Sequence, residues 1–143
     1  MTDLALARLL TELFTAIKLL SGYPVPDTYP EVHPLPRAQL EARICASSCS
    51  VKAYYIKGEG VFIDETLDVE HDARARSILL HELVHHVQGV TGKFDSFPDC
   101  DAWYARELEA YRIQNQYLHQ EGWNIGYHMG SYVRNCTAEP NGN

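Results

Sequence analysis

The residues best suited to chemistry in this chain form the run His81-Glu82-Leu83-Val84-His85. Residues four apart on an α-helix lie about 40° apart around its axis, so both imidazoles would face the same way. Two imidazole nitrogens on one face can bind one zinc ion, and an adjacent acid can accept a proton from a zinc-bound water. The spacing therefore predicts His81 and His85 as metal ligands and Glu82 as a general base.

The motif requires a helix, and its surroundings predict one. No Pro or Gly interrupts residues 73–88, and apolar residues recur there at helical spacing: Ile78, Leu79, Leu83 and Val87. Gly89 or Gly92 can end the helix. The alternative interpretation is a partly buried helix that carries solvated histidines.

A hydrolytic zinc site of this kind needs three protein ligands and one open position. We expect the third ligand on a helix over residues 101–120, capped by Asp99 or Asp101. Its apolar stripe consists of Tyr104, Leu108, Tyr111, Asn115 and Leu118. Glu107 lies about 40° from the centre of this stripe and Glu109 about 160° away. Glu107 is therefore the predicted third ligand.

Glu109, the competing acid, is expected to face solvent and to pair with Arg112 or Arg106. A metal-bound imidazole also needs an acceptor for its other N–H group. Asp101, Asp99 or a backbone carbonyl could serve, and the sequence does not select among them.

With these residues the sequence resembles the gluzincin branch of the zincin metallopeptidases, over roughly residues 50–120. In those families a second helix supplies a glutamate, often within a Glu-x-x-Ala-Asp-like signature. The run 107–111 (ELEAY) matches it with Glu107 as ligand, and Tyr111 replaces the usual acid. The chain looks most like the small, poorly characterised bacterial minimal zincins. The resemblance implies Zn²⁺ on His81, His85 and Glu107, and a peptide or protein substrate.

The remaining pattern predicts an α+β fold. We expect a helix over 4–20, a proline-rich segment over 23–36 with a short edge strand near Val32, and a short helix over 37–44. Strands over 50–57 and 60–64 would form a hairpin through the turn at 58–60. This order resembles the N-terminal half of a zincin. The resemblance implies one zincin-like domain over 1–143, with a small antiparallel sheet packed on the N-terminal, motif and glutamate-bearing helices.

The resemblance implies that the strand over 60–64 forms one edge of the cleft, where an extended peptide would add to it. An ordinary sheet strand without a substrate role is the alternative. The tail over 122–130 is rich in glycine and aromatic residues and should pack on the domain. Tyr127, His128 or Tyr132 could donate to an oxyanion, although packing is the simpler role. His86 is expected to be structural or exposed, His33, His71 and His119 to lie at the surface, and Gln88 to contact a neighbouring loop.

Composition limits the partners. The net charge of −7 with dispersed acids argues against a nucleic-acid surface and an anionic membrane. No apolar run approaches the roughly 18 residues of a spanning helix.

Four cysteines suggest disulfides and an exported protein, periplasmic or secreted, and we favour the pairs Cys45–Cys49 and Cys100–Cys136. Reduced thiols in a cytoplasmic protein are the alternative. A structural zinc site on the four cysteines is a weaker interpretation.

These observations lead to three hypotheses. The first is a zinc-dependent hydrolase, a metallopeptidase in which Glu82 acts as general base. The second is a non-catalytic zinc-binding or protein-interaction module on the same scaffold. The third is a metal-free helical domain whose histidines are incidental.

Overall fold

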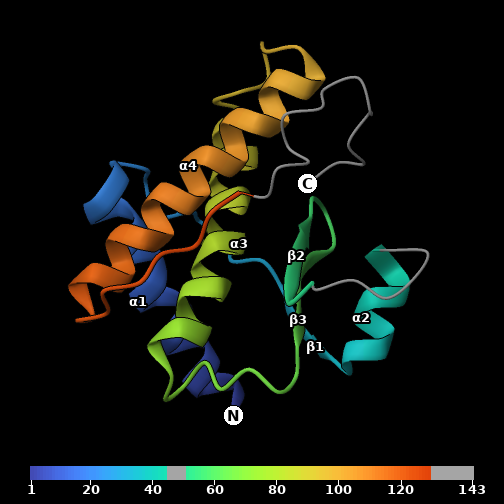
Figure 1. Ribbon diagram of the computed structural model, residues 1–143, viewed down its shortest axis with the longest axis vertical. Coiled ribbons are helices and arrows are strands. Elements are labelled where there is room, and N and C mark those ends of the chain that lie inside the picture. The colour runs from blue at the N-terminus through green and yellow to red at the C-terminus, as the bar shows by residue number, and fades with distance from the viewer. Residues whose placement is uncertain (45–50, 130–143) are drawn as a thin grey trace.

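A computed structural model describes residues 1–44 and 51–129 of the chain. Over these residues the fold is α+β, with four helices and a small mixed sheet of three strands (Figure 1). The elements follow the order α1 (Asp3–Ser21), β1 (Val32–Leu35), α2 (Arg37–Ile44), β2 (Ala53–Ile56), β3 (Gly60–Asp64), α3 (Ala73–Thr91) and α4 (Asp99–Gln120). The predicted fold class is thereby confirmed.

The helix ends follow local capping chemistry. The Asp72 side chain accepts a hydrogen bond from the backbone N–H of Arg74 and begins α3. Gly92, at φ +67°, ends α3, so the helix continues past Gly89. Helix α4 begins after Pro98 without a side-chain cap. The expected cap by Asp99 or Asp101 is therefore wrong, although both acids lie in the first turn, where they suit the helix dipole.

The sheet differs from the antiparallel sheet expected from the sequence. Its strand order is β1-β3-β2, with β2 antiparallel and β1 parallel to β3. The β2–β3 hairpin fills one side of β3, and the crossover through α2 leaves β1 to pair on the other side in the same direction as β3. All five residues of β3 are buried. The proposed cleft edge at 60–64 is therefore wrong, because β3 is the central strand.

Gly60 allows β3 to start where it does. Its φ is +114°, and a Cβ atom there would lie 2.3 Å from the Glu31 carbonyl oxygen. The same carbonyl accepts a hydrogen bond from Val61 N at 2.8 Å. Only glycine combines this backbone angle with so close an approach.

Helix α3 lies in the middle of the molecule, between α4 and the sheet, and also packs on α1 (Figure 1). The main core joins these elements through Leu9, Leu10, Leu13, Phe14, Ile17, Tyr23, Val61, Ile63, Leu79, Leu80, Leu83, Val84, Val87, Ala110, Ile113 and Tyr117. Because α3 has neighbours on several sides, almost all of its residues from 77 to 88 are buried, including the polar ones. Polar side chains there need partners within the protein.

Among the described residues, no helix combines the length and the apolar character needed to cross a membrane.

Candidate metal centre

The three predicted ligands meet between α3 and α4. The Nε2 atoms of His81 and His85 lie 3.2 Å apart. The Glu107 carboxylate lies 3.2 Å from Nε2 of His81 and 2.6 Å from Nε2 of His85. All three side chains are buried, and their ligand atoms lie within 4.8 Å of one another. The structure therefore brings one carboxylate and two imidazoles together at a single point.

Glu82 lies beside this cluster. Its Oε2 atom is 4.0 Å from Nε2 of His81, and the residue is buried. Burial raises the pKa of the Glu82 carboxyl, and the nearby Glu107 charge raises it further, against the opposing effect of His81 and His85. The acid of the motif therefore faces the same point as the ligands, in surroundings that favour its protonated form.

Two buried glutamines occupy the other ring nitrogens of the histidines. Oε1 of Gln114 lies 3.0 Å from Nδ1 of His81, and Oε1 of Gln88 lies 2.8 Å from Nδ1 of His85. An amide oxygen only accepts, so each Nδ1 carries a proton and Nε2 is the nitrogen left to face the cluster. The partners considered for the first histidine, Asp99, Asp101 or a backbone carbonyl, do not hold this position.

The two Nε2 atoms and the Glu107 carboxylate therefore form a cluster that a shared cation would stabilise. Two Nε2 lone pairs and a carboxylate converge, which is the His2Glu donor set that zinc takes in hydrolytic sites. Burial alone would lower the pKa of His85, but the Glu107 carboxylate outweighs it and raises that pKa to about 9. Burial would likewise raise the pKa of Glu107, yet the two imidazoles lower it to about 2. These three residues fit a zinc ion. Without an ion, a proton on His85 partly balances the charge of the Glu107 carboxylate.

Glu109 does not face solvent, so the expectation of an exposed residue is wrong. It is buried and accepts hydrogen bonds from Tyr23 Oη, from Gln88 Nε2 at 3.0 Å and from Lys93 Nζ at 2.5 Å. Its predicted partner Arg112 lies within 3.8 Å. Burial would raise the pKa of Glu109, but these donors, Lys93 foremost, lower it. This second glutamate supports Gln88.

The error arose from the predicted stripe on α4. Leu108, taken as close to the stripe centre, is 52% exposed. The buried face consists instead of Ala102, Glu107, Glu109, Ala110, Ile113, Gln114, Tyr117 and Leu118. Three of these residues are polar because they form the site and its support. The stripe predicted from hydrophobic residues therefore differs from the buried face of α4.

The supporting glutamines have a weak sequence signal. Gln88 lies three residues after His85, and Gln114 lies seven residues after Glu107, which places each on the ligand-bearing face of its helix. The only role we assigned to Gln88 was a contact with a neighbouring loop. Its actual contacts are with His85 and α4.

Tyr111 packs its ring edgewise on His81 with the centroids 4.4 Å apart. One turn further along α4, the Asn115 side chain binds the backbone N–H and C=O of Tyr127 at 2.7 and 2.9 Å. The segment before residue 130 therefore runs back along α4. The side chain of Tyr127 is half-buried and that of His128 is exposed, and their oxyanion role stays a prediction. Tyr132 lies outside the described residues.

The remaining histidines do not join the centre. His86 bonds the Tyr55 hydroxyl at 3.1 Å and lies 3.2 Å from the Thr28 carbonyl, a structural role as predicted. His71 and His119 are exposed, while His33 is half-buried and stacks on Phe62. The disulfide predictions for Cys45–Cys49 and Cys100–Cys136 fall on Cys45, Cys49 and Cys136, which lie outside the described residues.

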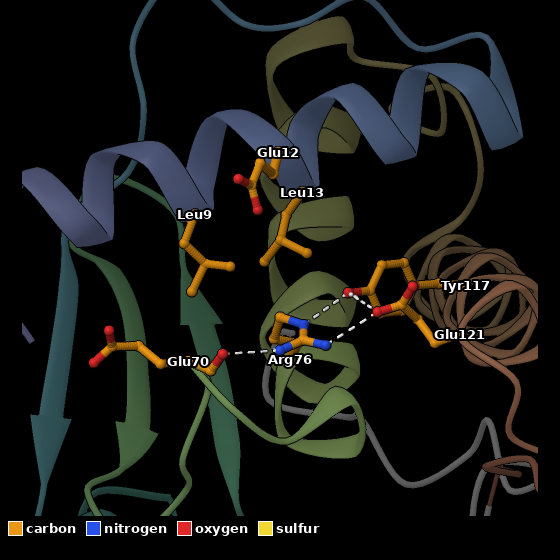
Figure 2. A pocket seen from close by; sticks show the side chains of 7 residues that line it. All are labelled: Leu9, Glu12, Leu13, Glu70, Arg76, Tyr117 and Glu121. Atoms are coloured by element: carbon orange, nitrogen blue, oxygen red, sulfur yellow. Dashed lines mark hydrogen bonds and ion pairs between the residues drawn. The ribbon is translucent and has the colours of Figure 1, made fainter.

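A surface hollow of about 310 Å³ lies where α1 meets the other end of the α3–α4 pair (Figure 2). Its lining residues are Leu9, Glu12, Leu13, Glu70, Arg76, Tyr117 and Glu121. None of the predicted site residues lines it. The hollow and the candidate metal centre are therefore separate features.

Comparison with known proteins gives a family without an assigned role. No curated protein and no solved structure matches the chain. The family model described as "Domain of unknown function (DUF6647)" matches residues 4–136. Because this match spans nearly the whole sequence, the chain belongs to the DUF6647 family.

Proposed function

We propose that the protein is a zinc-dependent hydrolase that cleaves peptide bonds. One observation carries the proposal: two imidazole Nε2 atoms and the Glu107 carboxylate converge at a buried point that Glu82 also faces. Ion binding alone requires ligands and their support. A second acid at that point, outside the ligand set, is what proton transfer requires.

Each residue has a distinct role in this proposal. His81, His85 and Glu107 hold the ion, which when bound would polarise the scissile carbonyl and make a water molecule acidic. Glu82 takes the proton of the attacking water and delivers it to the leaving amine. Burial raises the pKa of the Glu82 carboxyl, which makes its carboxylate a stronger proton acceptor than a solvated one. The choice of a peptide substrate rests on the resemblance to the gluzincins.

The first test is zinc content, measured by elemental analysis on protein purified without a metal-affinity tag. We expect about one zinc ion per chain, from the single His2Glu set, and its loss in Glu107→Ala. Arg76→Met is the matched control, because Arg76 lies between the same helices but outside the cluster. Absence of zinc from the wild-type protein after dialysis against zinc would leave the metal-free helical domain as the explanation.

The second test concerns catalysis. Glu82→Gln should retain zinc and lose at least about 100-fold in turnover of a peptide library, the usual contribution of a general base. Undiminished activity in that variant would eliminate Glu82 as the base. Zinc binding without turnover in the wild-type protein would instead favour the non-catalytic zinc-binding or protein-interaction module.

A further inference from the structure

We propose that Gln88 and Gln114 are positioning residues for the metal ligands, and that Glu109 fixes the amide of Gln88. This inference rests on the metal-binding part of the proposed function and not on catalysis. It assigns a role to three buried polar residues of α3 and α4 that do not touch the ion.

The hydrogen bonds around Gln114 orient its amide. Its Nε2 lies 3.2 Å from Oγ of Ser77, and that hydroxyl donates its single proton to the Arg74 carbonyl at 2.7 Å. The Ser77 oxygen must therefore accept, so it faces the NH2 group of Gln114. The amide oxygen is left for Nδ1 of His81. The hydrogen bonds of Ser77 and Gln114 thereby keep a proton on Nδ1 of His81.

The Gln88 amide is fixed by two acceptors. Its Nε2 donates to the Arg106 carbonyl and to Oε1 of Glu109, both at 3.0 Å. Neither oxygen can donate, so a flipped amide would place three acceptors together. The amide oxygen of Gln88 must therefore face Nδ1 of His85.

Glu109 is itself held in place. Tyr23 and Lys93 donate to its two carboxylate oxygens. A chain of contacts thus leads from Lys93, which is half-exposed, through Glu109 and Gln88 to the second ligand. The two networks differ at their far ends. The Gln114 network ends on a hydroxyl that can rotate, and the Gln88 network ends on a fixed carboxylate.

The test is zinc affinity, measured on metal-free protein by competition with a chromophoric chelator. Gln88→Leu and Gln114→Leu should each weaken zinc binding about 10- to 100-fold, the usual cost of removing a partner of a metal-bound histidine. Gln116→Leu, an exposed glutamine on the same helix, should have no effect. Arg76→Met should lower stability without changing zinc affinity, which separates positioning from general loosening of the helix pair.

The conservative variants give a sharper result. Gln114→Glu should retain most of the affinity, because the Ser77 hydroxyl can rotate and donate to the new carboxylate oxygen. Gln88→Glu should lose at least about 10-fold, because its second oxygen would face the Arg106 carbonyl and the Glu109 carboxylate. Adding Glu109→Gln to Gln88→Glu exchanges the acid and the amide, and should recover part of the loss.

The outcomes separate this inference from the proposed function. Losses in both leucine variants, with the asymmetry between the two glutamate variants, support it. Unchanged zinc affinity in both leucine variants would overturn it while leaving the metal centre intact. A wild-type protein that binds no zinc would overturn both the inference and the proposed function. Zinc binding with these losses but without turnover would support the inference and remove only the catalytic proposal.

Discussion

Two polar clusters lie between the same pair of helices and differ in their balance of donors and acceptors. Near the start of α3, Arg76 donates to Tyr117 Oη at 2.9 Å, to Glu121 Oε1 at 3.0 Å and to the Glu70 carbonyl at 3.1 Å (Figure 2). Every contact there joins a donor to an acceptor. Further along α3, the Nε2 atoms of His81 and His85 both face the Glu107 carboxylate.

The comparison shows which property marks a ligand site. The Arg76 cluster borders a hollow and is charged, yet its charges are paired within the protein. The histidine cluster uses both Nδ1 protons on glutamine oxygens and turns both Nε2 atoms toward Glu107, where a shared cation would stabilise it. We therefore take converging buried imidazole and carboxylate groups, rather than a hollow or a charge, as the feature that supports the proposed metal site.

The largest expected difference between the clusters is in the response to zinc. At a free zinc concentration of about 1,000 times Kd, the wild-type protein should gain about 4 kcal/mol in free energy of unfolding. Glu107→Ala should gain nothing, whereas Arg76→Met should gain as much as the wild type. Chemical denaturation with zinc and with a chelator measures all three. A gain in Glu107→Ala would place the ion elsewhere.

The second difference is in the pH dependence of the metal-free protein. The raised pKa of His85, about 9 against 6.5, stabilises the fold fully below pH 6.5, and this contribution is lost as the pH rises through 9. The lowered pKa of Glu107, about 2 against 4.5, contributes above pH 4.5 and is lost as the pH falls through 2. Chelated protein should therefore lose on the order of 2 kcal/mol between pH 6.5 and 9.

Urea denaturation across that range checks this expectation. The decline should vanish in Glu107→Ala, because the carboxylate is what raises the pKa of His85. It should persist in Arg76→Met, since a guanidinium keeps its charge throughout. A decline of equal size in Glu107→Ala would assign it to another group.

A smaller effect is expected from Arg76 itself. Arg76→Met should cost about 1–2 kcal/mol, since it removes three hydrogen bonds at a partly exposed position while the methionine retains the apolar stem. The melting temperature of metal-free protein gives the measurement. An unchanged melting temperature would show that this cluster contributes nothing to the α3–α4 contact.

The smallest effect concerns the segment beyond both clusters. Asn115→Ala removes the two hydrogen bonds to the Tyr127 backbone and should cost about 1 kcal/mol or less. Amide exchange at Tyr127 should become faster while zinc affinity stays the same. Weaker zinc binding in this variant would instead link the segment to the metal centre.

Sequence reasoning recovered the parts of the site that obey helical spacing. His81, Glu82 and His85 lie on α3, and Glu107 faces them from α4, as the periodicity predicts. The bounds of α2 and β3 also agree with the expected ranges. The helix and strand bounds depend on contacts within one segment. The position of Glu107 follows from the requirement that three ligands of one proposed ion must face the same point.

The errors concern features that depend on distant segments. Glu109 was expected in solvent because its helical angle opposed the apolar stripe, but Tyr23 and Lys93 approach it from other parts of the chain. The parallel pairing of β1 depends on the path through α2, which no strand pattern encodes. The glutamine supports resemble any polar residues until their partners are known.

The close approach of the Gly60 backbone to Glu31 should limit sequence variation at this position among related proteins. Because its backbone meets the Glu31 carbonyl in a space that excludes even a methyl group, substitution there would force β1 and β3 apart. Position 60 should therefore vary little among related proteins, although Gly60 lies outside the candidate metal centre. A survey of relatives that retain this sheet should find glycine there even in members that have lost the histidines.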